Sequence, residues 1–215
     1  MKKILFSLLV ALCVLTVPAL ASADDIMPPD WRGEYGSTHA EWSSWAFDGV
    51  SFVPDVFTQN PSEPQLLMPW INPSGGYQAA SEGVWFFDSF ALALDNFEYP
   101  NPVKEIRLQI TYQNQGFLPG IGSVTGSPPV DWEPYLVASV PVLGSPGWFT
   151  DVWDLTLWPN PGFEFVLVDD FPFLLVSQVV VDTLCAPAAV PVPGAVWLLG
   201  SGLIGLLGLR RKFKS

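Results

Sequence analysis

The side chains that most often perform catalysis are scarce in this chain. His39 is the only histidine, so a serine or cysteine nucleophile that needs an imidazole base would have to use it. The sequence has no Gly-x-Ser-x-Gly elbow, and one histidine cannot supply the ligands of a histidine-based zinc site. We therefore predict that His39 is structural or solvent-exposed and that the protein is not an enzyme.

Carboxylates, by contrast, are plentiful, with 21 Asp and Glu residues. Carboxylate oxygens are ligands that Ca²⁺ prefers, and Asp151 with Asp154 and Asp169 with Asp170 could supply them. Neither pair has the ligand spacing of an EF-hand loop, so a solvated acidic face is the favoured interpretation and a calcium site is the alternative. Paired acids for glycoside hydrolysis are a weaker hypothesis, because so many acids produce some close pairs in any fold.

Tryptophan offers another kind of chemistry, because an exposed indole can stack on a sugar ring. Nine Trp residues lie between positions 31 and 158, and we expect most of them to belong to the core. Trp132 lies in Gly116–Pro134, a segment with four Gly and four Pro that we expect to be a long surface loop. The sequence therefore predicts Trp132 as the accessible indole.

The charge is concentrated between residues 24 and 187. This segment holds all 21 acidic residues and three basic ones, Arg32, Lys104 and Arg107, which gives a formal charge of −18. Such a surface repels phosphate groups, which excludes nucleic acid as a partner. The many Trp and Phe residues supply apolar area for a core, so we expect a folded domain rather than an acidic disordered one.

The same segment has the pattern of short β-strands. Gly and Pro interrupt it about every ten residues, and no long helical stripe lies between them. In Lys104–Tyr112, Ile106, Leu108 and Ile110 alternate with polar residues. Such alternation is typical of an antiparallel strand with one buried and one solvated face.

Further strands are expected along the whole segment. Trp148–Trp158 and Phe163–Val168 flank a turn sequence that favours a hairpin, and Phe173–Cys185 is a long final strand with Cys185 buried at its end. Roughly eight to ten such strands predict an all-β, antiparallel β-sandwich of jelly-roll-like form. The remaining expected strands are Glu41–Phe47, Val50–Val53, Leu66–Trp70, Gly83–Phe87, Phe90–Leu94 and Tyr135–Leu143.

The first 23 residues differ from the rest. Lys2 and Lys3 precede the apolar run Ile4–Val17, and Ala21-Ser22-Ala23 follows it. This order is typical of a helical secretory signal peptide cleaved before Asp24, and a buried N-terminal helix is the alternative. We therefore expect an exported ectodomain over residues 24–187.

Residues 188–215 have a three-part order: a Pro-containing motif (190–193), an uncharged apolar run (194–209) and a basic tail (210–215). A helix of sixteen residues spans about 24 Å, and the preceding motif brings the stretch to bilayer length. The basic tail predicts a single transmembrane helix with the ectodomain outside the cytoplasm. The motif, the next glycine and the basic stop are Val190, Pro191, Val192, Pro193, Gly194, Arg210, Arg211 and Lys212.

This order resembles the PEP-CTERM sorting signal, a C-terminal tail that exosortase, a membrane-embedded cysteine transpeptidase-like enzyme, processes. The family's usual motif is Val-Pro-Glu-Pro, and Val192 replaces the Glu here. The resemblance implies exosortase as a partner, membrane insertion before processing, and a final place at the cell surface or outside the cell. A plain membrane anchor that is never cut is the alternative.

The ectodomain is also similar to a group of secreted β-sandwich domains that carry such tails, and this similarity implies no activity. It lies in residues 31–38, 104–109, 154–161 and 179–185. Together, these features predict a non-enzymatic surface or extracellular-matrix protein associated with exopolysaccharide or biofilm and without a required cofactor. A carbohydrate-binding module, with Ca²⁺ assistance, is the second hypothesis, and a glycan-active enzyme is the third.

Overall fold

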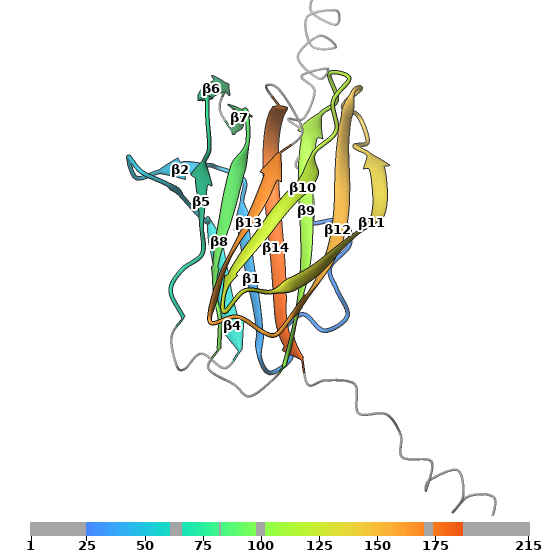
Figure 1. Cartoon of the computed structure of the whole chain (residues 1–215). Coiled ribbons are helices and arrows are strands. Elements are labelled where there is room, and N and C mark those ends of the chain that lie inside the picture. The colour runs from blue at the N-terminus through green and yellow to red at the C-terminus, as the bar shows by residue number, and fades with distance from the viewer. Residues whose placement is uncertain (1–24, 61–65, 82, 98–101, 170–173, 187–215) are drawn as a thin grey trace, which may run out of the picture.

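The computed structural model describes residues 25–60, 66–81, 83–97, 102–169 and 174–186 (Figure 1). Within these ranges the protein is all-β and its strands form two antiparallel sheets, as the sequence predicts. The predicted signal peptide and the tail 188–215, including the expected transmembrane segment 194–209, lie outside the described residues. No helix in the described part of the chain is long and apolar enough to cross a membrane.

The larger sheet has six strands in one continuous order and a short hairpin beside it. The hairpin consists of β6 (Tyr77–Ser81) and β7 (Val84–Phe87), and β7 joins it to the sheet by pairing with β14. The continuous order is β11 (Asp131–Pro141), β12 (Trp148–Trp158), β9 (Val103–Gln113), β14 (Leu174–Ala186), β1 (Ser37–Trp42) and β4 (Val56–Asn60).

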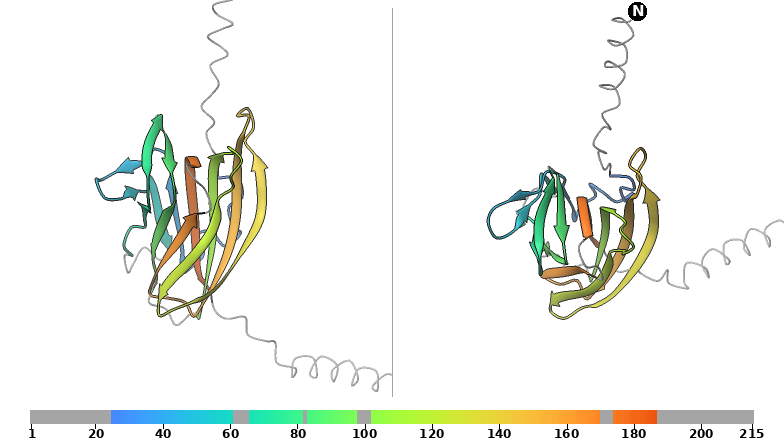
Figure 2. Two further views of the ribbon diagram at one scale, coloured as in Figure 1. Left: turned by 45° about the horizontal axis from the view of Figure 1, so that its top comes forward. Right: turned by 90° about the horizontal axis from the view of Figure 1, so that it is seen from above.

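The smaller sheet faces the larger one, so that the domain has two layers (Figure 2). Apolar side chains from both sheets form one buried cluster, which includes Phe90 and Val166 from the smaller sheet and Leu108 and Val181 from the larger. The order of the smaller sheet is β10 (Gly120–Ser127), β13 (Phe163–Asp169), β8 (Phe90–Asp95), β5 (Trp70–Pro73), β3 (Phe52–Val53) and β2 (Ala46–Phe47).

The alternation predicted for β9 is confirmed on its inner face, where Ile106, Leu108 and Ile110 are all buried. The expected solvated outer face is wrong at its centre, because Gln109 and Thr111 are also buried. The N-terminal segment lies over this face, and the backbone N–H groups of Ile26 and Met27 donate to Gln109 Oε1 at 3.2 and 3.1 Å. The sheet is thus covered on both sides there, although periodicity predicts one wet side.

The predicted hairpin of β12 and β13 is wrong, although both strands exist within one residue of their expected bounds. β12 pairs with β9 and β11 in the larger sheet, whereas β13 pairs with β8 and β10 in the smaller. The joining residues are tied to neighbouring loops: Asn160 N–H donates to Pro102 O at 2.8 Å, and Asn96 contacts Asn160 and Pro161. This turn therefore carries the chain from one sheet to the other.

The expected long loop Gly116–Pro134 is also wrong, because it contains β10 and the start of β11. The glycines reflect close packing. Gly122 lies at a bulge in β10, and a Cβ there would overlap the Asp169 carboxylate on β13. Pro134 is tolerated because β11 is an edge strand, where a missing N–H breaks no ladder bond.

The predicted strand Glu41–Phe47 is divided into the end of β1 and β2. Trp45 lies between them with φ of 57°, a left-handed conformation that is unusual for a side chain of this size. Its buried indole holds the corner, because Nε1 donates to Ser177 O at 2.8 Å on β14. The corner transfers the chain from the larger sheet to the smaller one.

Candidate functional site

A row of paired charges crosses the outer face of the larger sheet. Strand register aligns Asp154 on β12, Arg107 on β9, Asp182 on β14 and His39 on β1 as successive neighbours. Arg107 donates from Nε and Nη2 to the two oxygens of Asp154, both at 2.7 Å. His39 Nδ1 lies 3.0 Å from Asp182 Oδ1, so the only histidine belongs to this row rather than to a nucleophile.

Asp182 is fully buried in this row and depends on a second guanidinium. Arg32 donates from Nε and Nη2 to its two oxygens at 2.6 and 2.5 Å, a bidentate pairing that satisfies a desolvated carboxylate well. Arg32 also pairs with Asp25, which accepts a hydrogen bond from Gln109. We call residues 25–32 the N-terminal strap, since these contacts fasten it over the sheet.

The third basic side chain of the described residues lies inside the core. Lys104 on β9 and Glu164 on β13 form an ion pair between the two sheets, and both side chains are fully buried. Lys104 Nζ also donates to Asp95 O at 3.2 Å. Burial raises the pKa of Glu164, and the neighbouring Lys104 ammonium opposes that shift.

All three Arg and Lys residues of the described chain are thus held in ion pairs with carboxylates. None of them is left to offset the remaining acidic groups of the surface. The outer surface of this part of the protein is accordingly anionic, and electrostatic attraction favours cationic partners.

The acidic residues proposed as calcium ligands do not converge. Asp154 faces outward to Arg107, whereas Asp151, three residues earlier on β12, faces inward and accepts a hydrogen bond from Tyr112 at 3.1 Å. Desolvation raises the pKa of Asp151. Asp169 lies beside the β10 bulge, and Asp170 lies outside the described residues. The described chain contains no group of three or more His, Cys, Asp or Glu residues able to hold a metal ion.

The accessible indole is not the predicted one. Trp132 lies on β11 opposite Leu157 of β12, on the inner side of the sheet, and is partly buried against the core. Trp158, on the outer side of β12, is 57 % exposed, and the other eight Trp residues between positions 31 and 158 are buried or partly buried. Alternation within Trp148–Trp158 puts Trp158 on the face of the strand away from Leu155 and Leu157. The sequence therefore contained a signal that Trp158 is exposed, but the Gly and Pro residues around Trp132 favoured Trp132 instead.

A second aromatic group lies where the β6–β7 hairpin meets β2 and β3. The rings of Tyr77 and Trp85 are stacked at 6.4 Å, and Trp85 meets Phe52 edge to face at 4.7 Å. Phe47 contacts Phe52 and Tyr77 at 4.9 and 5.5 Å. These rings close one end of the core, while Tyr77 itself remains partly exposed.

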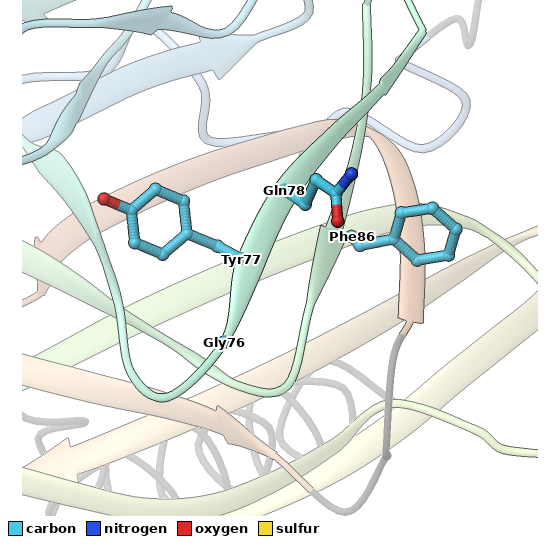
Figure 3. A pocket seen from close by; sticks show the side chains of 4 residues that line it. All are labelled: Gly76, Tyr77, Gln78 and Phe86. Atoms are coloured by element: carbon cyan, nitrogen blue, oxygen red, sulfur yellow. The ribbon is translucent and has the colours of Figure 1, made fainter.

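A shallow cavity of about 310 Å³ lies at the same hairpin, lined among the described residues by Gly76, Tyr77, Gln78 and Phe86 (Figure 3). Gln78 and Phe86 are cross-strand partners and point to the side away from Tyr77. A Cβ at Gly76 would lie 2.6 Å from Asp88 Oδ2, so a larger residue would displace the carboxylate that accepts from the Gly76 N–H at 2.8 Å. These four residues offer apolar contact, the amide of Gln78 and the phenol of Tyr77, and they include no histidine, carboxylate, thiol or amine.

Cys185 is buried near the end of β14, as the sequence predicts. Its thiol donates to Asn96 Oδ1 at 2.6 Å. Both residues lie inside the fold, next to the point at which the described chain ends.

Comparison with protein families identifies a PEP-CTERM protein-sorting motif at residues 189–212, so the predicted sorting signal is confirmed. Comparison with curated proteins and with solved structures finds no match. The motif begins three residues after Ala186, the last residue of β14. It implies recognition by exosortase, export and a cell-surface location.

Proposed function

We propose that this chain is a non-enzymatic, acidic surface or extracellular-matrix protein that exosortase-dependent sorting delivers and that associates with exopolysaccharide. The observation that carries the proposal is the sorting motif at residues 189–212, which follows directly on the last strand of the all-β ectodomain. In this account residues 1–23 are removed on export, residues 24–187 are displayed, and residues 188–215 are the signal. The basic residues at 210–212 stop transfer across the membrane.

The ectodomain is proposed to be a β-sandwich, and the single core enclosed by two facing sheets supports that class. Its jelly-roll-like form stays a prediction. A structural role for His39 is supported by its place beside Asp182 in the charged row. The engagement of Arg32, Lys104 and Arg107 in ion pairs supports an anionic surface suited to a hydrated matrix.

Carbohydrate binding is the second candidate, and a specific observation favours it. Trp158 and Tyr135 are 57 % and 68 % exposed on the same outer face of the larger sheet. Exposed aromatic rings on one face of a sheet can stack on sugar rings, and these two rings are available for that contact.

The location of the protein tests the proposal. In cells that contain a matching exosortase, the ectodomain should leave the membrane fraction and appear at the surface or in the medium. Deleting the exosortase, or replacing Pro191 and Pro193 by Ala, should retain the protein in the membrane, because the apolar span and basic stop still insert. Pro187→Ala, outside the matched motif, is the control and should behave as wild type. The same distribution with and without exosortase would refute delivery by sorting.

A further inference from the structure

The outer face of β11 and β12 forms a strip that carries two exposed aromatic rings and three carboxylates. This face lies at one edge of the larger sheet (Figure 1). Strand register places Asp131 opposite Trp158, Glu133 opposite Thr156, and Tyr135 opposite Asp154. Cross-strand partners share a face, so all six side chains point outward with Asp154. We call these six residues the outer strip.

The two rings of the outer strip are well separated. Tyr135 is aligned with a residue four positions before Trp158 on β12, which corresponds to about 13 to 14 Å along the strands. Glu133 and Thr156, both exposed, occupy the row between them. An extended chain of rings lying along the strands could therefore contact both aromatic side chains and pass over Glu133.

The charge of the outer strip is unbalanced. Asp154 is bound by Arg107, but Asp131 and Glu133 are exposed. All three Arg and Lys side chains of the described chain are engaged in ion pairs with other carboxylates. The face of an indole attracts cations through its quadrupole, and Trp is the strongest side chain in this respect. An indole beside carboxylates is thus suited to an ammonium group attached to an apolar ring face.

We propose that the outer strip binds a polysaccharide of amino sugars that carry free ammonium groups. The sugar rings stack on Trp158 and Tyr135, and the ammonium groups pair with Asp131 and Glu133. This inference rests on the proposed function, because it needs the domain to be displayed outside the cell, and it names the class of glycan that the domain holds.

A basic peptide is the competing cationic partner, and the edge strand disfavours it. Peptides commonly bind by adding a strand to a sheet edge. β11 is that edge, but Pro134 and Pro141 lack the N–H donors that an added strand requires, and a bulge between Leu136 and Ala138 interrupts its register. The outer face beside the edge keeps its side chains available for a ribbon of rings.

Calorimetry on the exported protein tests the proposal with two probes of equal length, a glucosamine hexamer and an N-acetylglucosamine hexamer. At about pH 6 and low salt, where ordinary carboxyl groups are ionised, the glucosamine hexamer should bind at least about fivefold more tightly. Trp158→Ala should weaken that binding at least about fivefold, and Trp158→Phe should restore part of it. Glu133→Gln should weaken it about two- to fivefold.

The control is Leu143→Ala, at the tip of the β11–β12 hairpin, where the side chain is 99 % exposed and outside the strip. It should bind the glucosamine hexamer as wild type does, and all variants should keep the wild-type melting temperature. Equal affinity for the neutral hexamer would overturn the ammonium assignment. Tighter binding of a lysine hexamer, with the same loss in Trp158→Ala, would make the strip a peptide site. Absence of binding would overturn the proposal without affecting delivery by the sorting signal, which is measured by location.

Discussion

Glu164→Gln removes one partner from the ion pair that joins the two sheets. Lys104 and Glu164 are both fully buried, and their strands, β9 and β13, belong to opposite sheets. Glutamine keeps a carbonyl oxygen but no charge, so the Lys104 ammonium is left with neutral acceptors, one of which is Asp95 O at 3.2 Å. Breaking a buried pair in this way typically costs about 3–5 kcal/mol, because the remaining charge has lost its compensation.

The loss should be visible in thermal and urea unfolding. For a domain of about 150 to 250 residues, 1 kcal/mol corresponds to a change of about 2–4 °C in melting temperature, so Glu164→Gln should lower it by about 6–20 °C. Replacing both partners, as Lys104→Met with Glu164→Leu, should give a protein as stable as wild type or more so, since no buried charge remains. Glu105→Gln, on the outer face of β9, is the matched control and should change stability by less than about 0.5 kcal/mol.

The double replacement separates the electrostatic cause from a packing defect. If Glu164→Gln unfolds within about 1 kcal/mol of wild type, then the pair is not ionised in the folded protein and the reasoning is refuted. If the double variant is as unstable as the single one, volume rather than charge controls the site.

Three further outcomes are expected. Arg32→Gln should lower the free energy of unfolding by about 2–4 kcal/mol, because the fully buried Asp182 loses its guanidinium partner. Arg107→Gln should lower it by about 1 kcal/mol or less, because its partner Asp154 is 42 % exposed. Equal losses in urea unfolding would contradict this ranking. Burial raises the pKa of Asp151, so the stability that this carboxyl contributes is complete below its pKa in the unfolded chain and is lost as pH rises through its pKa in the folded protein. Asp151→Asn should therefore raise the melting temperature by a few degrees at pH 7. The gain should vanish as pH falls toward about 4. A gain that is constant with pH would exclude this cause. Added NaCl should raise the melting temperature by screening a domain of formal charge −18. The calcium-site hypothesis requires a larger rise with CaCl2 at matched ionic strength, and an equal rise would contradict that hypothesis.

The sequence predicted the fold class because alternation reports burial on one face. The inward residues of β9 and β12 are those that the alternation predicts, and the observed bounds of both strands lie within one residue of the predicted ones. It could not report what covers the opposite face, since the strap at residues 25–32 is joined to Gln109 and Asp182 by contacts that span 82 residues or more. The buried outer face of β9 is therefore a tertiary result.

Turn composition was the weaker guide. Pro159–Gly162 has hairpin chemistry, yet it joins strands of different sheets, because both strands place apolar side chains into the same core from opposite sides. The glycines of Gly116–Pro134 indicated a loop, although one of them, Gly122, makes room for Asp169 in a strand. Local composition cannot distinguish a glycine that frees the chain from one that allows close packing.

In the candidate site, too, features set by adjacent residues were predictable and features set by tertiary contacts were not. The PEP-CTERM tail was predictable because its order of motif, apolar run and basic stop is contained in adjacent residues. The exposed ring of Trp158 was within reach of the alternation argument, but its pairing with Tyr135 depends on the register between β11 and β12. The pairings of Arg32 with Asp182, of Lys104 with Glu164 and of Arg107 with Asp154 depend on contacts between segments that lie far apart in the sequence.

The intact mass of the exported protein tests the central claim most directly. In cells with a matching exosortase, the mature protein should begin at Asp24 and should lack residues 203–215, and in cells without the enzyme it should keep Ser215 and remain in the membrane. If the protein exported from exosortase-containing cells always carries Ser215, the tail is a plain anchor and delivery by sorting is contradicted.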